Sequence, residues 1–421
     1  MHAEAAAVAQ VTQRGDRIVK TDVEARVPYS WEDRKPVLEL DFPAAEFEER
    51  IRAVQHALAQ RGADALAVYG GASQESNVRY LSGFGSWWGD ALVMVPRRGD
   101  PVLITNSIFH GEPMHSNLQT TWIQDLRPLL NPHSTGTPKS VVEAGRDVLG
   151  EWGALTGTVA FVDLDQAPSR ITRELSACWP QVHVHDGAPI LAGLRRIKSP
   201  AEIDLVRRLG RIASAGMDAG MAAVRPGVTE SEVAAAVHAG CIGAGAERMG
   251  YGVLASAGQR SHMKNIFPRP DKRIRENELV VIDLGCQLGG YRSDMSRNIV
   301  AGEPPMELRR LLDACLDAED AGIRHTRPGV SVVSVVTVMN DVIRRHGSEA
   351  WDWSTGHGFG LDTVEEPFFH PTNTAVLEPG MCFYIEPMIV PPTVGTICFE
   401  DMVVVTEDGC EVVTTSKRRM W

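Results

Sequence analysis

Five side chains in the second half of the sequence have the types and settings expected of metal ligands. They are Asp283 and Asp294 in LVVIDLGCQLGGYRSDMSRNIV, His357 in STGHGFGL, Glu386 in FYIEPMIV and Glu400 in TICFEDMVVV. Each lies in an apolar, strand-like or glycine-rich stretch, where burying an uncompensated charge would be costly. Four carboxylates with one imidazole suit two divalent ions, bridged by carboxylate oxygens and a water or hydroxide, better than one soft metal. The set predicts a binuclear site that activates an oxygen nucleophile or base.

Each acid taken alone is weak evidence, because charged residues are mostly solvated and a carboxylate in a turn is common. His357 is a stronger candidate. Gly356 and Gly358 on either side of it let the backbone turn sharply and project the imidazole into a cleft, although such loops also occur as plain turns. The prediction of a site therefore rests on the joint pattern.

Length and composition limit the kind of protein that could carry this site. A chain of 421 residues is too long for one hydrophobic core, so two domains are expected. A net charge of −12 argues against nucleic acid or an anionic membrane surface as a partner. No segment has the roughly 20 apolar residues of a membrane span and the N-terminus does not resemble a secretory signal, so a cytoplasmic protein is expected. Seven scattered cysteines without a CxxC pair argue against disulfides and a thiolate zinc site.

The first 190 residues predict an N-terminal extension, residues 1–40, followed by an α/β domain over residues 41–190. Apolar residues recur at three- and four-residue spacing from Phe47 to Leu58, which indicates an amphipathic helix ended by Gly62. Short strands are expected in ALAVYG, YLSGF, ALVMVP, PVLITN and TVAFVDLD, and a further helix over SVVEAGRDVLGEWG.

The remaining chain, residues 191–421, predicts a second domain built by duplication. Ser199 can cap a helix that has Pro200 at its first position and Glu202 in the capping box. RPGVTESEVAAAV is matched about a hundred residues later by RPGVSVVSVVTVM, each preceded by a helix-like stretch and followed by paired strands. Two such halves meeting about a pseudo-twofold axis would bring the two aspartates of one sheet to the two glutamates of the other.

This second domain resembles the α+β pita-bread catalytic domain of the aminopeptidase P, prolidase, methionine aminopeptidase and creatinase superfamily. The resemblance covers roughly residues 190–415. It rests on LRRIKSPAEI, IDLG and YRSDMSR with an eleven-residue separation of the two aspartates, GHGFGL, LEPGMCFYIEP and FEDMVVVTEDG, in that order. The preceding α/β domain resembles the creatinase and prolidase N-terminal domain, with NVRYLSGF where those proteins carry a similar Tyr-x-x-Gly-Phe stretch.

The resemblance implies a role for each of the five residues. Asp283 would be a bidentate ligand of one ion, Asp294 and Glu400 would bridge both ions, and His357 with Glu386 would complete the shell of the other. Manganese, cobalt, zinc and iron are used in the superfamily, and oxygen-rich ligation with one histidine favours Mn or Fe. In the peptidases a bridging hydroxide attacks the substrate carbonyl, and Glu386 is expected to shuttle the proton. The resemblance also implies a homodimer.

Two departures from the peptidase pattern concern residues that handle the scissile amide. Peptidases carry a second histidine seven positions after the metal-binding one, where this chain has Val364, and another seventeen positions before the first metal aspartate, where it has Ile266. Losing one donor to the oxyanion costs on the order of a hundredfold in rate. We therefore expect poor Xaa-Pro cleavage, unless His262, four residues off register, and His370, beyond the loop, replace the missing histidines.

Further candidate substrate contacts lie outside the metal set. Trp87 and Trp88 in GFGSWWGD could cage a cationic group, or pack in the core and at a subunit interface. Arg292 and Arg297 flank Asp294 and could hold a substrate carboxylate, or pair with surface acids.

Together these observations predict a binuclear metal-dependent hydrolase that cleaves an amide-type C–N bond in a small amino-acid derivative or dipeptide. The alternatives are a metal-assisted lyase resembling the dimethylsulfoniopropionate lyase of this fold, a genuine Xaa-Pro aminopeptidase or prolidase, and a non-catalytic binding module. The lyase has an acid near the position of Val364, where Asp362, Glu365 and Glu366 are available unless they form a solvated loop. The presence of all five ligand types argues against the binding module.

Overall fold

The computed structural model of the chain describes residues 31–71, 74–86, 89–108, 118–130, 140–350 and 355–420. These residues form two compact units, unit 1 ending at Leu194 and unit 2 beginning at Arg195. The division falls within helix α8 (Ala188–Arg196), as does the predicted boundary between residues 190 and 191. Trp87 and Trp88 lie outside the described residues.

Unit 1 is an α/β domain built on one six-stranded mixed sheet with the order β4-β3-β2-β1-β5-β6. Its strands are β1 (Ala65–Gly71), β2 (Asp90–Pro96), β3 (Val102–Ile108), β4 (Asp125–Leu130), β5 (Thr158–Val162) and β6 (His183–Asp186). Its other helices are α2 (Trp31–Arg34), η1 (Lys35–Val37), α3 (Ala44–Arg61), α4 (Ser76–Ser82), η3 (Leu118–Thr120), α6 (Val141–Glu151) and α7 (Ser169–Cys178). The central strands β1 and β2 are buried along their whole length, which accounts for their near-continuous apolar sequences.

Helices α3 and α4 illustrate one correct and one wrong prediction in unit 1. Helix α3 follows the predicted apolar spacing and ends where Gly62 adopts a left-handed φ of 68°. The prediction of a strand in YLSGF is wrong, because its first residues belong to α4, which Gly83 ends with a φ of 75°. Val78 and Leu81 are both buried and lie three residues apart. A short apolar run does not distinguish that helical spacing from a buried strand.

Unit 2 consists of two halves with a similar order of elements. The first half contains α9 (Pro200–Ala223), α10 (Glu230–Gly243), β7 (Arg248–Ala257), η4 (Gly258–His262), β8 (Leu279–Leu288), β9 (Tyr291–Arg292) and β10 (Met295–Val300). The second contains α11 (Met306–His325), α12 (Val332–Arg345), β11 (His357–Gly358), β12 (Glu365–Phe368), β13 (Cys382–Ile385), β14 (Met388–Ile389), β15 (Ile397–Cys398), β16 (Asp401–Val405) and β17 (Cys410–Val412). A helix pair followed by strands in each half confirms the predicted duplication. The predicted capping box of Ser199 and Glu202 is present at the start of α9.

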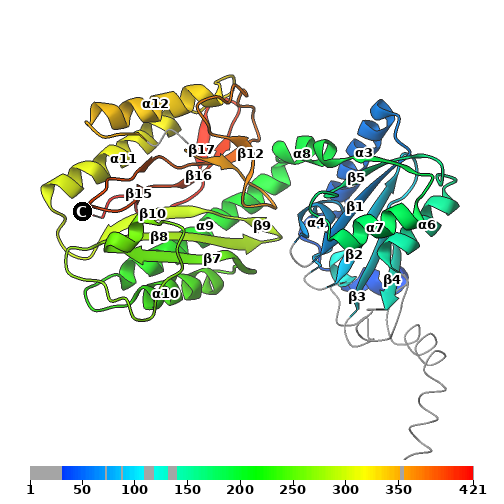
Figure 1. Cartoon of the computed structure of the whole chain (residues 1–421), viewed down its shortest axis with the longest axis horizontal. Coiled ribbons are helices and arrows are strands. Elements are labelled where there is room, and N and C mark those ends of the chain that lie inside the picture. Colours follow the sequence, from blue (N-terminus) through cyan, green and yellow to red (C-terminus); the bar gives the residue numbers. More distant parts are fainter. Residues whose placement is uncertain are drawn as a thin grey trace, which may run out of the picture. The chain divides into compact units, whose positions relative to one another are not determined.

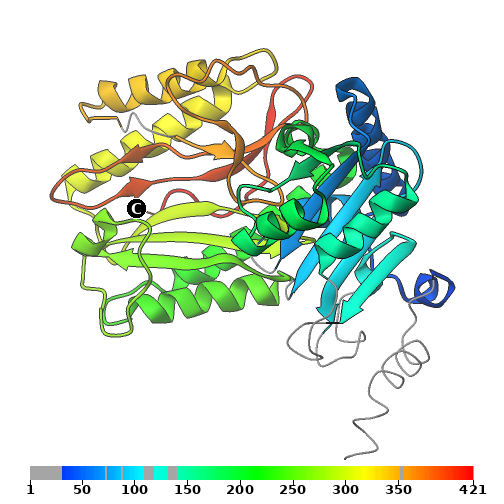
Figure 2. The same ribbon diagram turned by 45° about the vertical axis from the view of Figure 1, so that its right-hand side comes forward.

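The strands of unit 2 lie between the helix pair α9–α10 and the helix pair α11–α12 (Figure 1), and the turned view shows the same layers (Figure 2). The strands of the two halves meet at an isolated bridge between Ser296 of β10 and Glu400, which directly precedes β16. Arg297 reinforces this junction, since its Nη1 donates to the carbonyl of Glu400 at 2.8 Å. Ser296 also lies opposite Asp283 in the antiparallel β8–β10 ladder. The junction therefore brings carboxylates from both halves together.

The sequence also led us to expect neither disulfides nor a membrane-spanning segment. All seven cysteines are free thiols. Among the described helices, none combines the length and the hydropathy needed to cross a membrane.

Candidate metal centre

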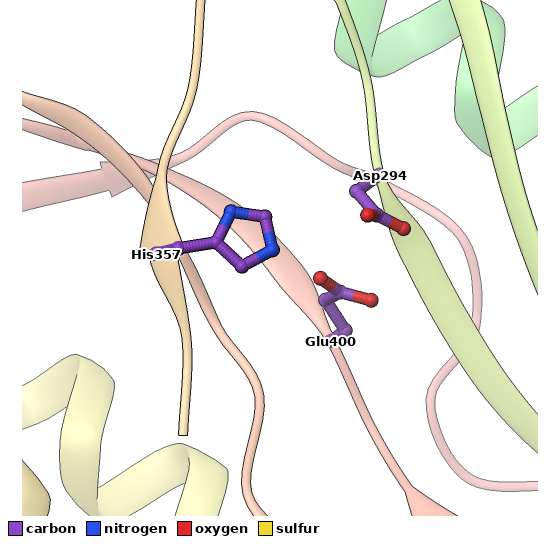
Figure 3. Close-up of side chains that lie close together, drawn as sticks. All are labelled: Asp294, His357 and Glu400. Carbon is purple, nitrogen blue, oxygen red and sulfur yellow. The ribbon is translucent and has the colours of Figure 1, made fainter. Parts of the chain in front are cut away.

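Asp294, His357 and Glu400 form the centre of the site, because their potential ligand atoms all lie within 4.8 Å of one another. Asp294 immediately precedes β10, His357 begins β11, and Glu400 immediately precedes β16, so both halves of unit 2 contribute. Figure 3 shows the imidazole of His357 directed toward the two carboxylates. Imidazole and carboxylate donors in this arrangement suit a divalent first-row metal ion. The structure thus brings three of the five predicted ligands into one cluster.

The backbone around His357 orients the imidazole for ligation. Its Nδ1 lies 3.1 Å from the carbonyl oxygen of Gly358. A carbonyl can only accept, so Nδ1 carries the proton and Nε2 is left to a ligand. Gly356 has a φ of 141°, and a Cβ there would lie 2.0 Å from the carbonyl oxygen of Tyr384, so the position requires glycine. Burial lowers the pKa of His357, which favours the neutral form that binds metal.

Glu400 is fully buried and has one oxygen, Oε1, without a hydrogen-bond partner among the described residues. Its Oε2 accepts a hydrogen bond from Ser296 Oγ at 3.0 Å. Asp294 accepts from the Tyr251 hydroxyl on Oδ1. Burial raises the pKa of Asp294 and of Glu400 well above the ordinary values, and repulsion between neighbouring carboxylates adds to this effect. A cation would satisfy the orphaned oxygen and offset the repulsion, so these residues fit a divalent metal ion.

Asp283 lies beside this centre with both of its oxygens already engaged. Its Oδ1 contacts the Tyr251 hydroxyl, which also contacts Asp294, and its Oδ2 lies 2.9 Å from Ser296 Oγ, which also contacts Glu400. Each hydroxyl has one proton, which its two carboxylates share. The same Oδ2 lies 2.8 Å from Lys264 Nζ. Burial alone would raise the pKa of Asp283, but attraction to the Lys264 ammonium and the hydrogen bonds lower it below its ordinary value. Asp283 is thus held as a carboxylate by protein groups.

Lys264 is the residue of the site that the sequence-based prediction missed. Its Nζ contacts Glu386 Oε1 and lies 3.8 Å from Glu400 Oε2, in addition to its contact with Asp283. The side chain is only 11% exposed. The sequence does contain a signal for it, because the lysine in SHMKNIFPRP is a charge among Met, Ile and Phe, which is an apolar setting. Tyr251, which was also missed, gave no such signal, because a tyrosine in a strand is common.

The two histidines proposed as replacements have other partners. The ring nitrogens of His262 lie 3.0 Å from the carbonyl oxygens of Gln259 and Pro391. Nδ1 of His370 lies 2.8 Å from Thr372 Oγ1. Neither histidine belongs to the cluster formed by the three central ligands. At the two positions where peptidases have histidine, Val364 is 52% exposed and Ile266 is half-buried.

The acids near Val364 are engaged in ion pairs or exposed. Arg195 contacts Glu365, and its Nη2 also lies 2.7 Å from Asp362 Oδ2. Lys198 Nζ lies 3.3 Å from Glu365 Oε2. Burial would raise the pKa of Glu365, but these two cations and a backbone hydrogen bond lower it to about 2. Glu366 is exposed. The expectation of a solvated loop is therefore wrong for Glu365, which belongs to a buried ion cluster.

The two arginines that flank Asp294 differ in their surroundings. Arg297 is buried and pairs with Asp401, which is also buried, so its partner is neither a substrate nor a surface acid. Arg292 is half-buried, and its Nε has no hydrogen-bond partner among the described residues. Arg292 therefore remains the candidate for binding a substrate carboxylate.

Two family profiles match the sequence. Residues 204–407 match Metallopeptidase family M24, and residues 50–197 match the Creatinase/Prolidase N-terminal domain. The Xaa-Pro dipeptidase of Pyrococcus furiosus is 32% identical over 232 residues, which are 55% of this chain and 66% of that protein. An uncharacterized peptidase of Bacillus subtilis is 31% identical over 228 residues, 54% of this chain and 64% of that protein. The alignments thus span slightly less than two thirds of these relatives.

Two solved structures share the fold of this chain over most of its length. The prolidase from Pyrococcus horikoshii matches with a TM-score of 0.76 at 23% identity, covering 89% of this chain and 100% of the other. The dipeptidase PepE from Mycobacterium ulcerans matches with a TM-score of 0.74 at 25% identity, covering 90% and 98%. These likenesses extend over both units and confirm the fold expected from the sequence.

Proposed function

We propose that the chain is a metal-dependent hydrolase of metallopeptidase family M24, whose profile residues 204–407 match, and that it cleaves an amide-type C–N bond in a small amino-acid derivative or dipeptide. The observation that carries the proposal is the cluster of Asp294, His357 and Glu400, with the orphaned Oε1 of Glu400 inside it. A divalent ion held by these residues would polarise a carbonyl group and lower the pKa of a water molecule.

The protein's own groups have separate tasks in this proposal. Nε2 of His357 and the oxygens of Asp294 and Glu400 would hold the ion. Glu386 moves the proton from the attacking water molecule to the leaving nitrogen. Its Oε1 accepts from Lys264, whereas its Oε2 has no hydrogen bond with the described residues and is therefore available to a proton. The exclusion of bulk water from this buried site would strengthen the electrostatic interactions within it.

The metal and the assembly are part of the same proposal. The five predicted ligands, Asp283 and Glu386 included, offer enough donor atoms for two divalent ions, and their oxygen-rich character favours Mn or Fe over Co or Zn. However, the Lys264 ammonium shares three of the carboxylates, so the ligand count alone does not set the number of ions. We place the enzyme in the cytoplasm as a homodimer, on the resemblance to the superfamily.

Genuine Xaa-Pro dipeptidase activity is the second candidate. It is favoured by the 32% identity to the Xaa-Pro dipeptidase of Pyrococcus furiosus. Against it stand Val364 and Ile266, which cannot donate a hydrogen bond to an oxyanion as an imidazole can. A lyase is less well supported, because two of the three acids near Val364 are neutralised by Arg195 and Lys198.

The test is a substrate screen on protein reconstituted separately with Mn, Fe, Co and Zn. One panel contains Xaa-Pro dipeptides, and the other contains small amides, betaines and sulfonium compounds. We expect metal-dependent hydrolysis of a small amide, lost in Glu400→Gln and kept in the control Glu303→Gln, whose side chain is 92% exposed. Robust Xaa-Pro turnover would favour the second candidate, and an elimination product would favour the lyase. Activity that is indifferent to metal would overturn both hydrolase proposals.

A further inference from the structure

Lys264 lies within the set of predicted metal ligands. Its Nζ is 2.8 Å from Asp283 Oδ2, contacts Glu386 Oε1 and is 3.8 Å from Glu400 Oε2. These three acids are its only ion-pair partners among the described residues, and all three belong to the five-residue set. The ammonium therefore offsets part of the negative charge of these carboxylates, which the sequence-based prediction expected metal ions alone to offset.

Tertiary contacts anchor the backbone next to Lys264, and this anchoring helps to direct the lysine side chain toward the site. His262 Nε2 lies 3.0 Å from the carbonyl oxygen of Pro391. The backbone N–H of Thr396 donates to the carbonyl of Ser261 at 3.1 Å. Gly395 allows this close packing, since a Cβ at that position would lie 1.9 Å from Ser261 Oγ. The segment before Lys264 is thus fixed against the second half of unit 2.

A divalent ion on the same oxygens would conflict with the ammonium. Metal–oxygen bonds are about 2.0–2.2 Å long for ions such as Zn²⁺. An ion on Asp283 Oδ2 would therefore lie close to a cation that is itself 2.8 Å from that oxygen. Two cations at such a separation in a buried site repel each other strongly. Either Lys264 leaves the site or the second ion is excluded.

The potential ligand atoms that Lys264 does not contact are sufficient for one metal ion. Oε1 of Glu400 is orphaned, and Nε2 of His357 is left to a ligand by the contact of Nδ1 with Gly358. Asp294 uses Oδ1 for Tyr251, and its Oδ2 has no hydrogen bond with the described residues. These residues are the three whose potential ligand atoms cluster within 4.8 Å.

We propose that Lys264 takes the place of one of the two metal ions, so that each chain holds a single resident divalent ion at Asp294, His357 and Glu400. The inference rests on the proposed function, which requires metal, but not on the identity of the substrate. It implies that removing the ammonium without changing any ligand opens a second metal site at Asp283 and Glu386.

Metal counting on the full-length chain tests this inference. Wild type, Lys264→Met and the control Lys272→Met are loaded with Mn²⁺ and freed of unbound metal, and their metal content is measured by emission spectrometry. Lys272 pairs with Glu278 at 2.6 Å, outside the predicted ligand set. We expect about one ion per chain in wild type and Lys272→Met and about two in Lys264→Met. Electron paramagnetic resonance should change from an isolated to an exchange-coupled manganese signal. If circular dichroism shows Lys264→Met unfolded, Lys264→Gln replaces it.

Three outcomes would overturn the inference. Two ions in wild type, with exchange coupling, would show that Lys264 withdraws and would leave the proposed function intact. One ion in both wild type and Lys264→Met would show that the lysine does not exclude the second ion. No bound metal in wild type would overturn the proposed function and the inference together.

Discussion

Replacing Glu365 with glutamine should destabilise unit 2 by about 3 kcal/mol at pH 7. The Glu365 side chain is 10% exposed, and its carboxylate contacts Arg195 and Lys198, whose side chains are 9% and 1% exposed. Glutamine keeps the size of the side chain but removes its charge, so Lys198 would be left buried without the carboxylate that it contacts. Because Glu365 also pairs with Gly358 between β12 and β11, the loss would reach the backbone next to His357.

The magnitude follows from the pKa of Glu365. Burial would raise it, but Arg195, Lys198 and the backbone N–H of Asp362 together lower it from the usual 4.5 to about 2. At about 1.4 kcal/mol per pH unit, the difference between these values corresponds to about 3 kcal/mol. That figure agrees with the roughly 3–5 kcal/mol lost when one partner of a buried ion pair is removed.

The pH dependence of this effect has a definite sign. The pKa of Glu365 is lower in the folded chain than in the unfolded chain, so between these values the unfolded chain binds more protons. The stabilisation by Glu365 is therefore complete above about pH 4.5 and is lost as the pH falls toward 2. The free-energy difference between wild type and Glu365→Gln should stay constant near neutral pH and shrink on acidification.

Denaturant-dependent hydrogen exchange on peptides from β8 would measure the free energy of unfolding of unit 2 separately from that of unit 1. The matched control is Glu378→Gln, because Glu378 pairs with Arg196 at 3.1 Å but is 51% exposed. A surface pair of this kind contributes about 1 kcal/mol or less. Equal losses in the two variants at pH 7, or a difference that grows on acidification, would refute the reasoning.

Two further predictions concern the metal centre. Gly356→Ala should destabilise unit 2 by about 2–4 kcal/mol in chemical denaturation and weaken metal binding, because its Cβ would lie 2.0 Å from the carbonyl oxygen of Tyr384. Gly243→Ala, whose Cβ meets nothing within 4 Å, should change neither property appreciably. Metal binding should release protons and strengthen as the pH rises, because burial raises the pKa of Asp294 and Glu400 in the metal-free site. Calorimetry in two buffers of different ionisation enthalpy would detect the release, and binding that is independent of pH would contradict it.

Local sequence patterns predicted those parts of the fold that depend on residues close together in the chain. The capping box of Ser199 and Glu202 is fully local, and the helix it starts was predicted correctly. The duplication was visible because each half repeats the same short motif before its second helix. Once a duplication is assumed, the convergence of Asp294 and Glu400 follows from symmetry. Only the structure reveals the bridge between Ser296 and Glu400 that joins the halves.

The direction of a side chain in an irregular segment is not encoded in such patterns. Lys264 follows η4 in a stretch without helical or strand periodicity, so no spacing rule relates it to ligands more than a hundred residues away. Its place is set by tertiary contacts of the preceding residues, such as that of His262 with Pro391. The same holds for Glu365, whose sequence context is that of a surface loop and whose partners come from the segment before α9.

Lys264 also bears on the missing peptidase histidines. It lies two positions from Ile266 and has three N–H donors, so it could in principle replace one imidazole as a donor to a substrate oxygen. Its ammonium, however, already faces the carboxylates of Asp283, Glu386 and Glu400. A donor committed to three carboxylates is not available to a developing oxyanion. This lysine therefore does not compensate for the missing histidine at Ile266, and poor Xaa-Pro cleavage stays a prediction.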